Sequence, residues 1–163
     1  MISQKKASKQ IKLSLLLHNI RSTHNVGSIF RTADAVGISK IYISGYTPAP
    51  IDRFGRVRKD IAKSSLGAEE SVPWENIVDV ISFIKESKKK GIEIIGLEQD
   101  EKSIDYKKVK KQKENLIILG EEVNGIEKGI LALCDQIAEI PMNGKKESLN
   151  VSVATGVFLY SLI

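Results

Sequence analysis

Strand-like and helix-like segments alternate along the chain, and this alternation constrains the fold more than any other feature of the sequence. The first strand-like segment, 13–17, is a continuous apolar run, as expected of a buried strand. Further strands are expected at 40–44, 93–97, 115–119 and 136–140. Strands that alternate with helices predict an α/β fold: a single domain with a mostly parallel sheet and helices on both faces.

The helices are expected between these strands. Asn25 is a candidate N-cap for a helix that ends at Gly37, and apolar residues at helical spacing predict a helix over 76–90. The segment 46–59 contains Pro and Gly without a clear period, and we expect a long loop that is functional or mobile. The remaining expected elements are short helices at 60–66 and 125–133, a short strand at 71–73, an exposed Lys-rich connector at 102–113 and a final helix at 149–163.

The composition is that of a globular protein of modest size. The chain has 163 residues, of which 42% are hydrophobic, enough for one domain with a real core. A single cysteine excludes a disulfide framework and fits a reducing compartment. No apolar run approaches the ~20 residues of a membrane span, and the N-terminus lacks the apolar stretch of a secretory signal. We therefore expect a cytoplasmic protein without a membrane partner, with a basic tail at 1–12 and one domain at 13–163.

Positive charge is concentrated in the first part of the chain. The formal net charge is +5, but residues 1–63 carry 12 Lys and Arg against 3 Asp, so this segment has a net charge of +9 and the remainder −4. All five arginines lie in this segment, and the guanidinium is the cation best suited to bidentate phosphate contact. Most charge of this kind is an ordinary solvated surface, but the distribution favours a polyanionic partner somewhat.

Several common α/β sites lack their signatures here. No two glycines are separated by a single residue, which excludes the usual dinucleotide fingerprint, and no Gly-Lys-Ser/Thr sequence marks a phosphate-binding loop. A Gly-x-Ser-x-Gly elbow for a serine nucleophile is also missing. His18 and His24 have no carboxylate or cysteine at metal-ligand spacing, so no metal site is expected. Because ligands of parallel sheets bind at the carboxyl ends of strands, the site is expected in the loops after residues 17, 44, 97, 119 and 140.

Three polar segments occur near these strand ends, at 25–33, 119–126 and 140–154. In the first, Asn25 and Arg31 lie about two helical turns apart, and Gly27 between them would clear space, so that the segment could hold a phosphate or a ribose at the helix start. Each segment also has an ordinary explanation: a capping Asn with a surface Arg, a turn flanked by glycines, and Ser148 as an N-cap. Taken singly, none of them identifies a function.

In this order, the three segments resemble the motifs of the SPOUT class of RNA methyltransferases, specifically its SpoU/TrmH branch. The first motif, Asn-x-Gly-x-x-x-Arg-x-Ala, is matched from Asn25 to Ala33. The second, Leu-Gly-x-Glu-x-x-Gly-Ile, is matched from Leu119 to Ile126. The third, Ile-Pro-Met-x-Gly followed by Ser-Leu-Asn-Val-Ser-x-Ala, is matched from residue 140 to residue 154. The match covers nearly the whole chain after the first twelve residues.

The resemblance implies a fold and a reaction that the residue pattern does not show. The fold would contain a deep trefoil knot over about 115–163, with a pocket for S-adenosylmethionine built from the knot loops. The reaction would transfer a methyl group to a ribose 2′-hydroxyl of structured RNA, with tRNA slightly preferred over rRNA. By motif position, the cofactor pocket would be lined by Leu97, Gly120, Ile140, Met142 and Leu149.

The resemblance also implies the catalytic residues. Arg31 is the catalytic arginine by motif position, and because the pKa of a guanidinium exceeds ~12, we expect it to clamp the target phosphate. It would act as a base only with help from that phosphate. Asn25 would place Arg31 or the ribose, and Glu122 would order the second loop. Ser148 and Asn150 would set the knot loop and contact the nucleotide.

Members of this branch act as homodimers, and the apolar final helix is expected either to form that contact or to be buried in its own core. With about twelve residues before the first strand, RNA selection would depend on the basic tail and the core surface. Five cations in and after the 46–59 loop, together with Phe54, suit RNA: Arg53, Arg56, Arg58, Lys59 and Lys63. The alternative is a non-catalytic knotted RNA-binding or assembly module, which need not bind S-adenosylmethionine.

Overall fold

The computed structural model describes residues 10–163, so Lys5, Lys6 and Lys9 of the expected basic tail lie outside the described residues. In this part of the chain, seven strands form one sheet in the order β3-β2-β1-β6-β4-β7-β5, and every neighbouring pair is parallel. The strands are β1 (Lys12–His18), β2 (Lys40–Ser44), β3 (Trp74–Ile77), β4 (Glu93–Leu97), β5 (Ile104–Asp105), β6 (Glu114–Leu119) and β7 (Gln136–Glu139). The helices are α1 (Thr23–Val36), α2 (Lys59–Ser65), α3 (Ala68–Ser71), α4 (Val80–Lys89), the 3-10 helix η1 (Tyr106–Lys108), α5 (Lys128–Leu131) and α6 (Val151–Ser161). The predicted α/β fold is confirmed.

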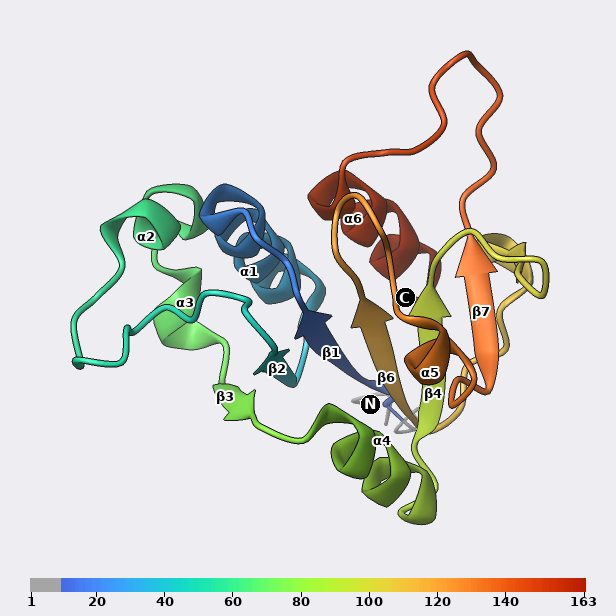
Figure 1. Cartoon of the computed structure of the whole chain (residues 1–163), viewed down its shortest axis with the longest axis horizontal. Coiled ribbons are helices and arrows are strands. Elements are labelled where there is room, and N and C mark those ends of the chain that lie inside the picture. The colour runs from blue at the N-terminus through green and yellow to red at the C-terminus, as the bar shows by residue number, and fades with distance from the viewer. Residues whose placement is uncertain (1–9) are drawn as a thin grey trace, which may run out of the picture.

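Helices cover both faces of the sheet, and each face has its own hydrophobic core (Figure 1). On one face, Phe30 of α1 and Phe158 of α6 are fully buried against the sheet. On the other face, Ile84 of α4 is fully buried, with α5 beside it. Successive residues of β1 serve the two cores, since Leu15 belongs to the first and Leu16 to the second. This double burial explains why the central strands read as continuous apolar runs.

The strand order brings distant segments together at one edge of the sheet. β6 lies between β1 and β4, although β4 precedes it in the chain by almost twenty residues. Because all strands run in the same direction, the loops that follow β1, β2, β4, β6 and β7 all emerge at the same edge (Figure 1). The fold therefore gathers the loops in which the sequence predicted a site.

The strand predictions were confirmed except at one position. The predicted segments 40–44 and 93–97 are β2 and β4 as they stand, and the other three predicted strands differ from β1, β6 and β7 by one residue at their ends. The short strand predicted at 71–73 was wrong, because this segment begins at the end of α3 and the strand there, β3, starts at Trp74. β3 pairs with β2 at the edge of the sheet, where its exposed Glu75 and Asn76 give no alternating pattern.

The first helix begins three residues earlier than a cap at Asn25 would allow. Ser22 is the N-cap, and its Oγ accepts a hydrogen bond from the backbone N–H of Asn25 at 3.1 Å. Asn25 therefore lies inside the first turn, where its side chain is free for other contacts. The predicted end at Gly37 is confirmed, since Gly37 adopts the left-handed conformation (φ 85°) that suits glycine at a C-cap.

Four other predicted elements differ from the observed ones: three helices were predicted too long, and one connector contains regular structure that was not predicted. The helix predicted at 76–90 begins at Val80, because Asp79 caps it by accepting from Ser82 N at 3.0 Å. The helix predicted at 125–133 contains only α5, and the one predicted at 149–163 is α6, capped by Asn150 and not by Ser148. The connector predicted at 102–113 contains β5 and η1.

Gly27 makes room for a helix, not for a ligand. A Cβ at this position would stand 1.9 Å from Oγ of Ser64 and 2.5 Å from the carbonyl oxygen of Ile61, both on α2. The Gly of the first motif is therefore required by the close packing of α1 on α2. The sequence interpretation, in which Gly27 clears space for a phosphate or ribose, was wrong on this point.

Candidate active site

A cavity of about 460 Å³ opens at the carboxyl edge of the sheet. Its walls come from the loops after β4, β6 and β7 and from the first residues of α6. This volume lies in the range of about 300–1,000 Å³ that is typical of small-molecule sites. The lining residues carried over from the resemblance are Leu97, Gly120, Ile140, Met142 and Leu149 for the cofactor, and Glu122, Ser148 and Asn150 for catalysis.

The wall from the β6 loop is a tight turn that depends on two glycines. Glu121 and Gly125 form an isolated bridge, in which the Gly125 N–H donates to the Glu121 carbonyl at 2.8 Å. Gly125 has a φ of 70°, the left-handed region that favours glycine. At Gly120, a Cβ would lie 2.6–2.7 Å from atoms of Gly125 and Ile126, so a side chain there would push the turn open. The two motif glycines thus set the shape of this wall.

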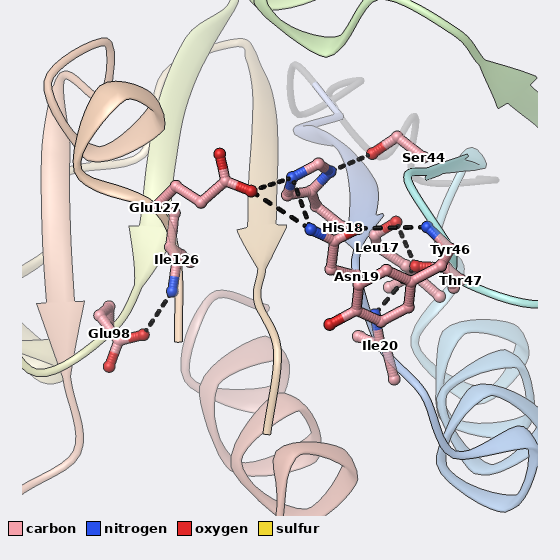
Figure 2. Close-up of polar contacts among 10 residues, drawn as sticks. All are labelled: Leu17, His18, Asn19, Ile20, Ser44, Tyr46, Thr47, Glu98, Ile126 and Glu127. Atoms are coloured by element: carbon pink, nitrogen blue, oxygen red, sulfur yellow. Dashed lines mark hydrogen bonds and ion pairs between the residues drawn. The ribbon is translucent and has the colours of Figure 1, made fainter. Parts of the chain in front are cut away.

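Glu98, directly after β4, holds the same turn from the opposite side. Its Oε2 accepts a hydrogen bond from the Ile126 N–H at 2.9 Å, a contact drawn in Figure 2. Beside it, Gln99 Nε2 donates to the carbonyl oxygen of Glu147 at 2.8 Å and so joins the β4 loop to the segment before α6. Sequence reasoning missed both residues, although their position at a strand end was a usable signal.

A chain of three side chains connects the three motifs. Glu122 of the β6 loop accepts hydrogen bonds from the Arg21 N–H (3.2 Å), the Ser22 N–H (3.3 Å) and Nδ2 of Asn25 (3.4 Å). Oδ1 of Asn25, in turn, accepts from Nδ2 of Asn150 at 3.1 Å. Oδ1 of Asn150 accepts from the Ser152 and Val153 N–H groups at the start of α6. Because a carboxylate can only accept, Glu122 sets the orientation of both amides.

Arg31 is not part of this cluster. It lies on α1, and its exposed side chain makes no hydrogen bond or ion pair with another residue of the described range 10–163. It does not line the cavity. Its neighbour Thr32 packs toward Gly156 of α6, so Arg31 stands beside the α1–α6 contact.

The cavity is strongly acidic. Five of its lining residues are glutamates and none is Lys or Arg: Glu98, Glu121, Glu122, Glu139 and Glu147. Hydrogen bonds from the backbone of Asn124 and Val123, with the nearby charge of Arg21, lower the pKa of Glu121 against the opposing effect of its burial. Glu121 is therefore ionised at neutral pH, and the site favours a ligand that carries positive charge.

A second polar cluster ties together the ends of β1 and β2 and the β6 loop (Figure 2). His18, almost fully buried, contacts Oγ of Ser44 through Nδ1 (2.8 Å) and Oε1 of Glu127 through Nε2 (3.1 Å). Asn19 Nδ2 donates to the same Glu127 oxygen at 3.2 Å, and Asn19 Oδ1 accepts from the Tyr46 N–H at 3.1 Å. Sequence reasoning placed His18 at a strand end but could not see a partner more than one hundred residues away.

The loop expected to bind RNA is a structured turn. Ile51 and Val57 form a bridge, and Oδ1 of Asp52 accepts from the N–H groups of Phe54 and Arg56. Phe54 is 66% exposed but not bare, since the guanidinium carbons of Arg53 and Arg56 lie 4.8 and 5.0 Å from its ring centroid. The predicted long loop is confirmed, since no helix or named strand lies between β2 and α2, and these bonds give its tip a defined conformation.

The five predicted RNA-binding cations are not equivalent. Arg53 and Arg56 are exposed in the turn, and Lys59 and Lys63 are exposed on α2. Arg58 is half-buried, and its Nε has no hydrogen-bond partner within the described chain. None of the five lines the cavity.

Two further findings concern the described residues alone. Between residues 10 and 163, no group of three or more His, Cys, Asp or Glu side chains is placed to hold a metal ion. None of the helices in this range is long and apolar enough to cross a membrane.

Comparison with known proteins assigns the chain to a family. The sequence pattern described as the SpoU rRNA Methylase family matches residues 12–160. The chain belongs to the SpoU rRNA methylase family. Among curated proteins, this SpoU chain is 32% identical to a member of the TrmH family of tRNA/rRNA methyltransferases from Staphylococcus saprophyticus, over 99% of the chain and 62% of that protein. It is also 32% identical to YacO of Bacillus subtilis, named for the same family, over 91% of the chain and 57% of that protein.

Solved structures agree with this assignment. The A. aeolicus TrmH/SpoU tRNA modifying enzyme superposes with a TM-score of 0.81 at 28% identity, over 93% of this chain and 74% of that one. The AdoMet-bound rRNA methyltransferase from Sinorhizobium meliloti superposes with a TM-score of 0.83 at 26% identity, over 92% of this chain and 55% of that one. The SpoU chain thus spans less than two thirds of the length of the curated relatives it matches.

Proposed function

We propose that this chain uses S-adenosylmethionine to methylate a ribose 2′-hydroxyl of RNA. The observation that carries the proposal is the acidic cavity at the carboxyl edge, closed by the contacts Glu122–Asn25–Asn150 that unite the three motifs. The similarity to an rRNA methyltransferase solved with AdoMet bound supports the cofactor. The ribose as target and tRNA as preferred substrate rest on the motif resemblance.

The residues of the cavity fit the proposed cofactor. Leu97, Ile140, Met142 and Leu149 offer apolar walls to the adenosine, and the turn after Gly120 offers backbone groups to its polar edges. The cofactor carries a positive sulfonium and a positive ammonium group, and its sulfonium supplies the methyl group. The five glutamates of the lining complement this positive charge.

In the proposed reaction, the ribose oxygen attacks the methyl carbon while the bond between that carbon and sulfur breaks. The protein's task is to align the two and to help the hydroxyl lose its proton. Asn25, held between Glu122 and Asn150, is fixed for contact with the ribose. Arg31 would clamp the adjacent phosphate, whose oxygen is a better proton acceptor than a guanidinium.

The exposed position of Arg31 is accounted for if the active unit is a homodimer with a target site shared across its interface. One face of α6 and its flanks is apolar and 38–65% exposed, over Leu149, Val153, Val157, Tyr160 and Ile163. The opposite face, with Phe158 and Leu159, is buried in the protomer's own core. We propose that the exposed face pairs with the same face of a second copy, and that Arg31 beside it serves the shared site.

RNA would approach over the positively charged segment. The turn with Arg53 and Arg56, followed by Lys59 and Lys63, supplies cations for phosphates, and its net charge contrasts with the acidic cavity. We keep the trefoil knot over about 115–163 as part of this proposal. It is supported by the path of the chain from β7 back to α6, which packs on α1 and η1. A cytoplasmic location would follow from an RNA substrate.

The test combines cofactor binding with product analysis. Calorimetry should show S-adenosylmethionine binding, and incubation with bulk tRNA or rRNA should transfer its labelled methyl group. A 2′-O-methyl group removes the nucleophile of alkaline cleavage, so the labelled nucleotides should resist alkali. Label in alkali-sensitive nucleotides would place the methyl group on a base and refute the ribose target. If the chain shows neither S-adenosylmethionine binding nor methyl transfer, the non-catalytic RNA-binding module is favoured.

A further inference from the structure

The structure leaves one surface beside the cavity that the proposed function does not use. In the loop after β1, the guanidinium carbon of Arg21 lies 5.5 Å from the centroid of the Tyr46 ring, which belongs to the loop after β2. Both residues are exposed, Tyr46 by 52%. The backbone N–H of Arg21 donates to Glu122, a residue of the cavity wall, so the Arg21–Tyr46 pair lies next to the cavity.

The backbone under this pair is held by an unusual arrangement. Asn19 has a φ of 59°, a left-handed conformation that is strained for most residues other than glycine and that Asn tolerates best. At Gly45, which lies beside it, a Cβ would stand 1.8 Å from Oδ1 of Asn19 and would displace it, and the φ of 63° at Gly45 favours glycine. From this position Asn19 Oδ1 accepts the Tyr46 N–H (Figure 2).

Further bonds fix the two loops to each other. Thr47 Oγ1 accepts from the Ile20 N–H at 3.0 Å and donates to the Leu17 carbonyl at 3.1 Å. The contacts of His18 with Ser44 and Glu127, also drawn in Figure 2, fix the strand ends below. These bonds hold the two loops in a fixed arrangement beneath the exposed side chains of Arg21 and Tyr46.

The Tyr46 ring has no structural task that explains it. Tyr46 belongs to neither hydrophobic core of the described residues, and its backbone, not its ring, makes the contact with Asn19. The Tyr46 side chain and the charge of Glu121 raise the pKa of the Arg21 guanidinium, which is positively charged at neutral pH in any case. An aromatic ring and a guanidinium plane, preorganised and exposed, form a surface suited to stacking a nucleobase.

The charges nearby favour a base over a phosphate. Glu121 and Glu122 lie next to Arg21, and Glu127 lies next to Asn19, which holds Tyr46. Their carboxylates repel phosphate but not the neutral face of a base. We infer that Tyr46 and Arg21 form a stacking platform for a nucleobase adjacent to the nucleotide that is methylated. This inference rests on the proposed RNA substrate.

The experiment compares Tyr46→Ala, Tyr46→Phe and Arg21→Ala in the full chain, with Lys107→Ala as the control. Lys107 also forms a cation–π pair, over Tyr106, but follows β5, the outermost strand on the side of the sheet away from β2. The probe is a short single-stranded RNA that contains 2-aminopurine, whose fluorescence is quenched on stacking. Binding of S-adenosylmethionine, measured by calorimetry, checks that each variant is folded.

Tyr46→Ala should weaken RNA binding about 5- to 150-fold and abolish the quenching, because stacking of one base contributes that much. Tyr46→Phe should stay within about 3-fold of the wild type, since the ring remains. Arg21→Ala should weaken binding without changing its salt dependence. A salt slope that falls by about 0.7–1 in Arg21→Ala would show a phosphate contact instead and overturn the platform.

The outcome is separable from that of the proposed function. If Tyr46→Ala binds the RNA as well as the wild type while the wild type still forms alkali-resistant product, the platform is refuted and the ribose methylation stands. If the quenching depends on Tyr46 but the product is alkali-sensitive, the platform stands and the ribose target is wrong. Lys107→Ala should leave affinity and quenching unchanged, and a loss equal to that of Arg21→Ala would overturn the assignment of Arg21.

Discussion

Nδ2 of Asn150 donates a hydrogen bond to Oδ1 of Asn25 at 3.1 Å, and this bond joins residues that are 125 positions apart. Oδ1 of Asn150 at the same time caps α6. One side chain therefore begins the final helix and, through Asn25, connects it to Glu122 and the cavity wall. The position requires both an acceptor and a donor, which Asn supplies.

The two tasks of Asn150 can be separated. Asn150→Ala should lower the free energy of unfolding by about 1 kcal/mol, because the helix no longer has its cap. Asn150→Ser keeps a capping oxygen and should be destabilised less, although it no longer donates to Asn25. Both variants should methylate RNA at least about 5-fold more slowly, since Asn25 is no longer held. Urea denaturation and initial rates provide the two measurements, and equal stability of the two variants would contradict the capping role.

A side chain at Gly27 should disturb the packing of α1 on α2. Gly27→Ala is expected to destabilise the protein by about 1–3 kcal/mol, because its Cβ would clash with a backbone oxygen as well as with Ser64. Gly129→Ala, also in a helix but with nothing within 4 Å of its Cβ, should be neutral or slightly stabilising. Thermal or urea unfolding distinguishes the two variants. A Gly27→Ala variant as stable as the wild type would show that the packing of α1 on α2 does not require glycine at position 27.

Glu121 should make stability depend on acid pH. Its folded-state pKa is lowered, chiefly by the backbone N–H of Asn124, so its contribution is fully present above its unfolded value of about 4.5 and disappears as the pH falls below that value. The free energy of unfolding should therefore decrease less between pH 5 and pH 3 in Glu121→Gln than in the wild type. Glu70→Gln, at an exposed position outside the cavity, controls for the removal of one negative charge. Parallel pH profiles of wild type and Glu121→Gln would contradict this role.

The exposed face of α6 can be tested through a buried charge. In a two-fold dimer, Val157→Asp introduces its carboxylate twice at one interface, so the dissociation constant should rise at least about 100-fold. Val78→Asp is the matched control, since Val78 is fully exposed and lies outside α6. Sedimentation at micromolar concentration should show a dimer for the wild type and Val78→Asp and a monomer for Val157→Asp. A wild-type protein that sediments as a monomer would refute the proposed dimer.

The basic turn should contribute through charge. Replacing Arg53 and Arg56 with Ala should weaken RNA binding and reduce the slope of log affinity against log salt by about 0.7–1 for each phosphate that is no longer neutralised. Arg58 is left unchanged, because its half-buried side chain makes an effect on folding difficult to separate from an effect on binding. An unchanged affinity across salt concentrations would make the turn an ordinary surface feature.

The sequence by itself determined the central strands and the identity of the motif residues. Strands such as β4 and β6 are buried on both faces, so their apolar runs carry the signal locally. The same local signals were misleading where tertiary structure decides. β3 is a strand only because β2 pairs with it, and the helix predicted from residue 125 is displaced by the turn that Glu98 and Glu121 hold.

Only the tertiary structure decided which contacts the motif residues make. The sequence predicts Asn25 as the N-cap, but in the structure Ser22 is the cap, and the Asn25 side chain instead contacts Glu122 and Asn150. The sequence suggests that Gly27 leaves space for a ligand, but in the structure residues of α2 fill that space. Burial and hydrogen bonding between residues one hundred positions apart depend on the strand order, and local periodicity carries no information about that order. The cavity and the pair of Arg21 with Tyr46 exist for the same reason: parallel strands bring their loops to one edge.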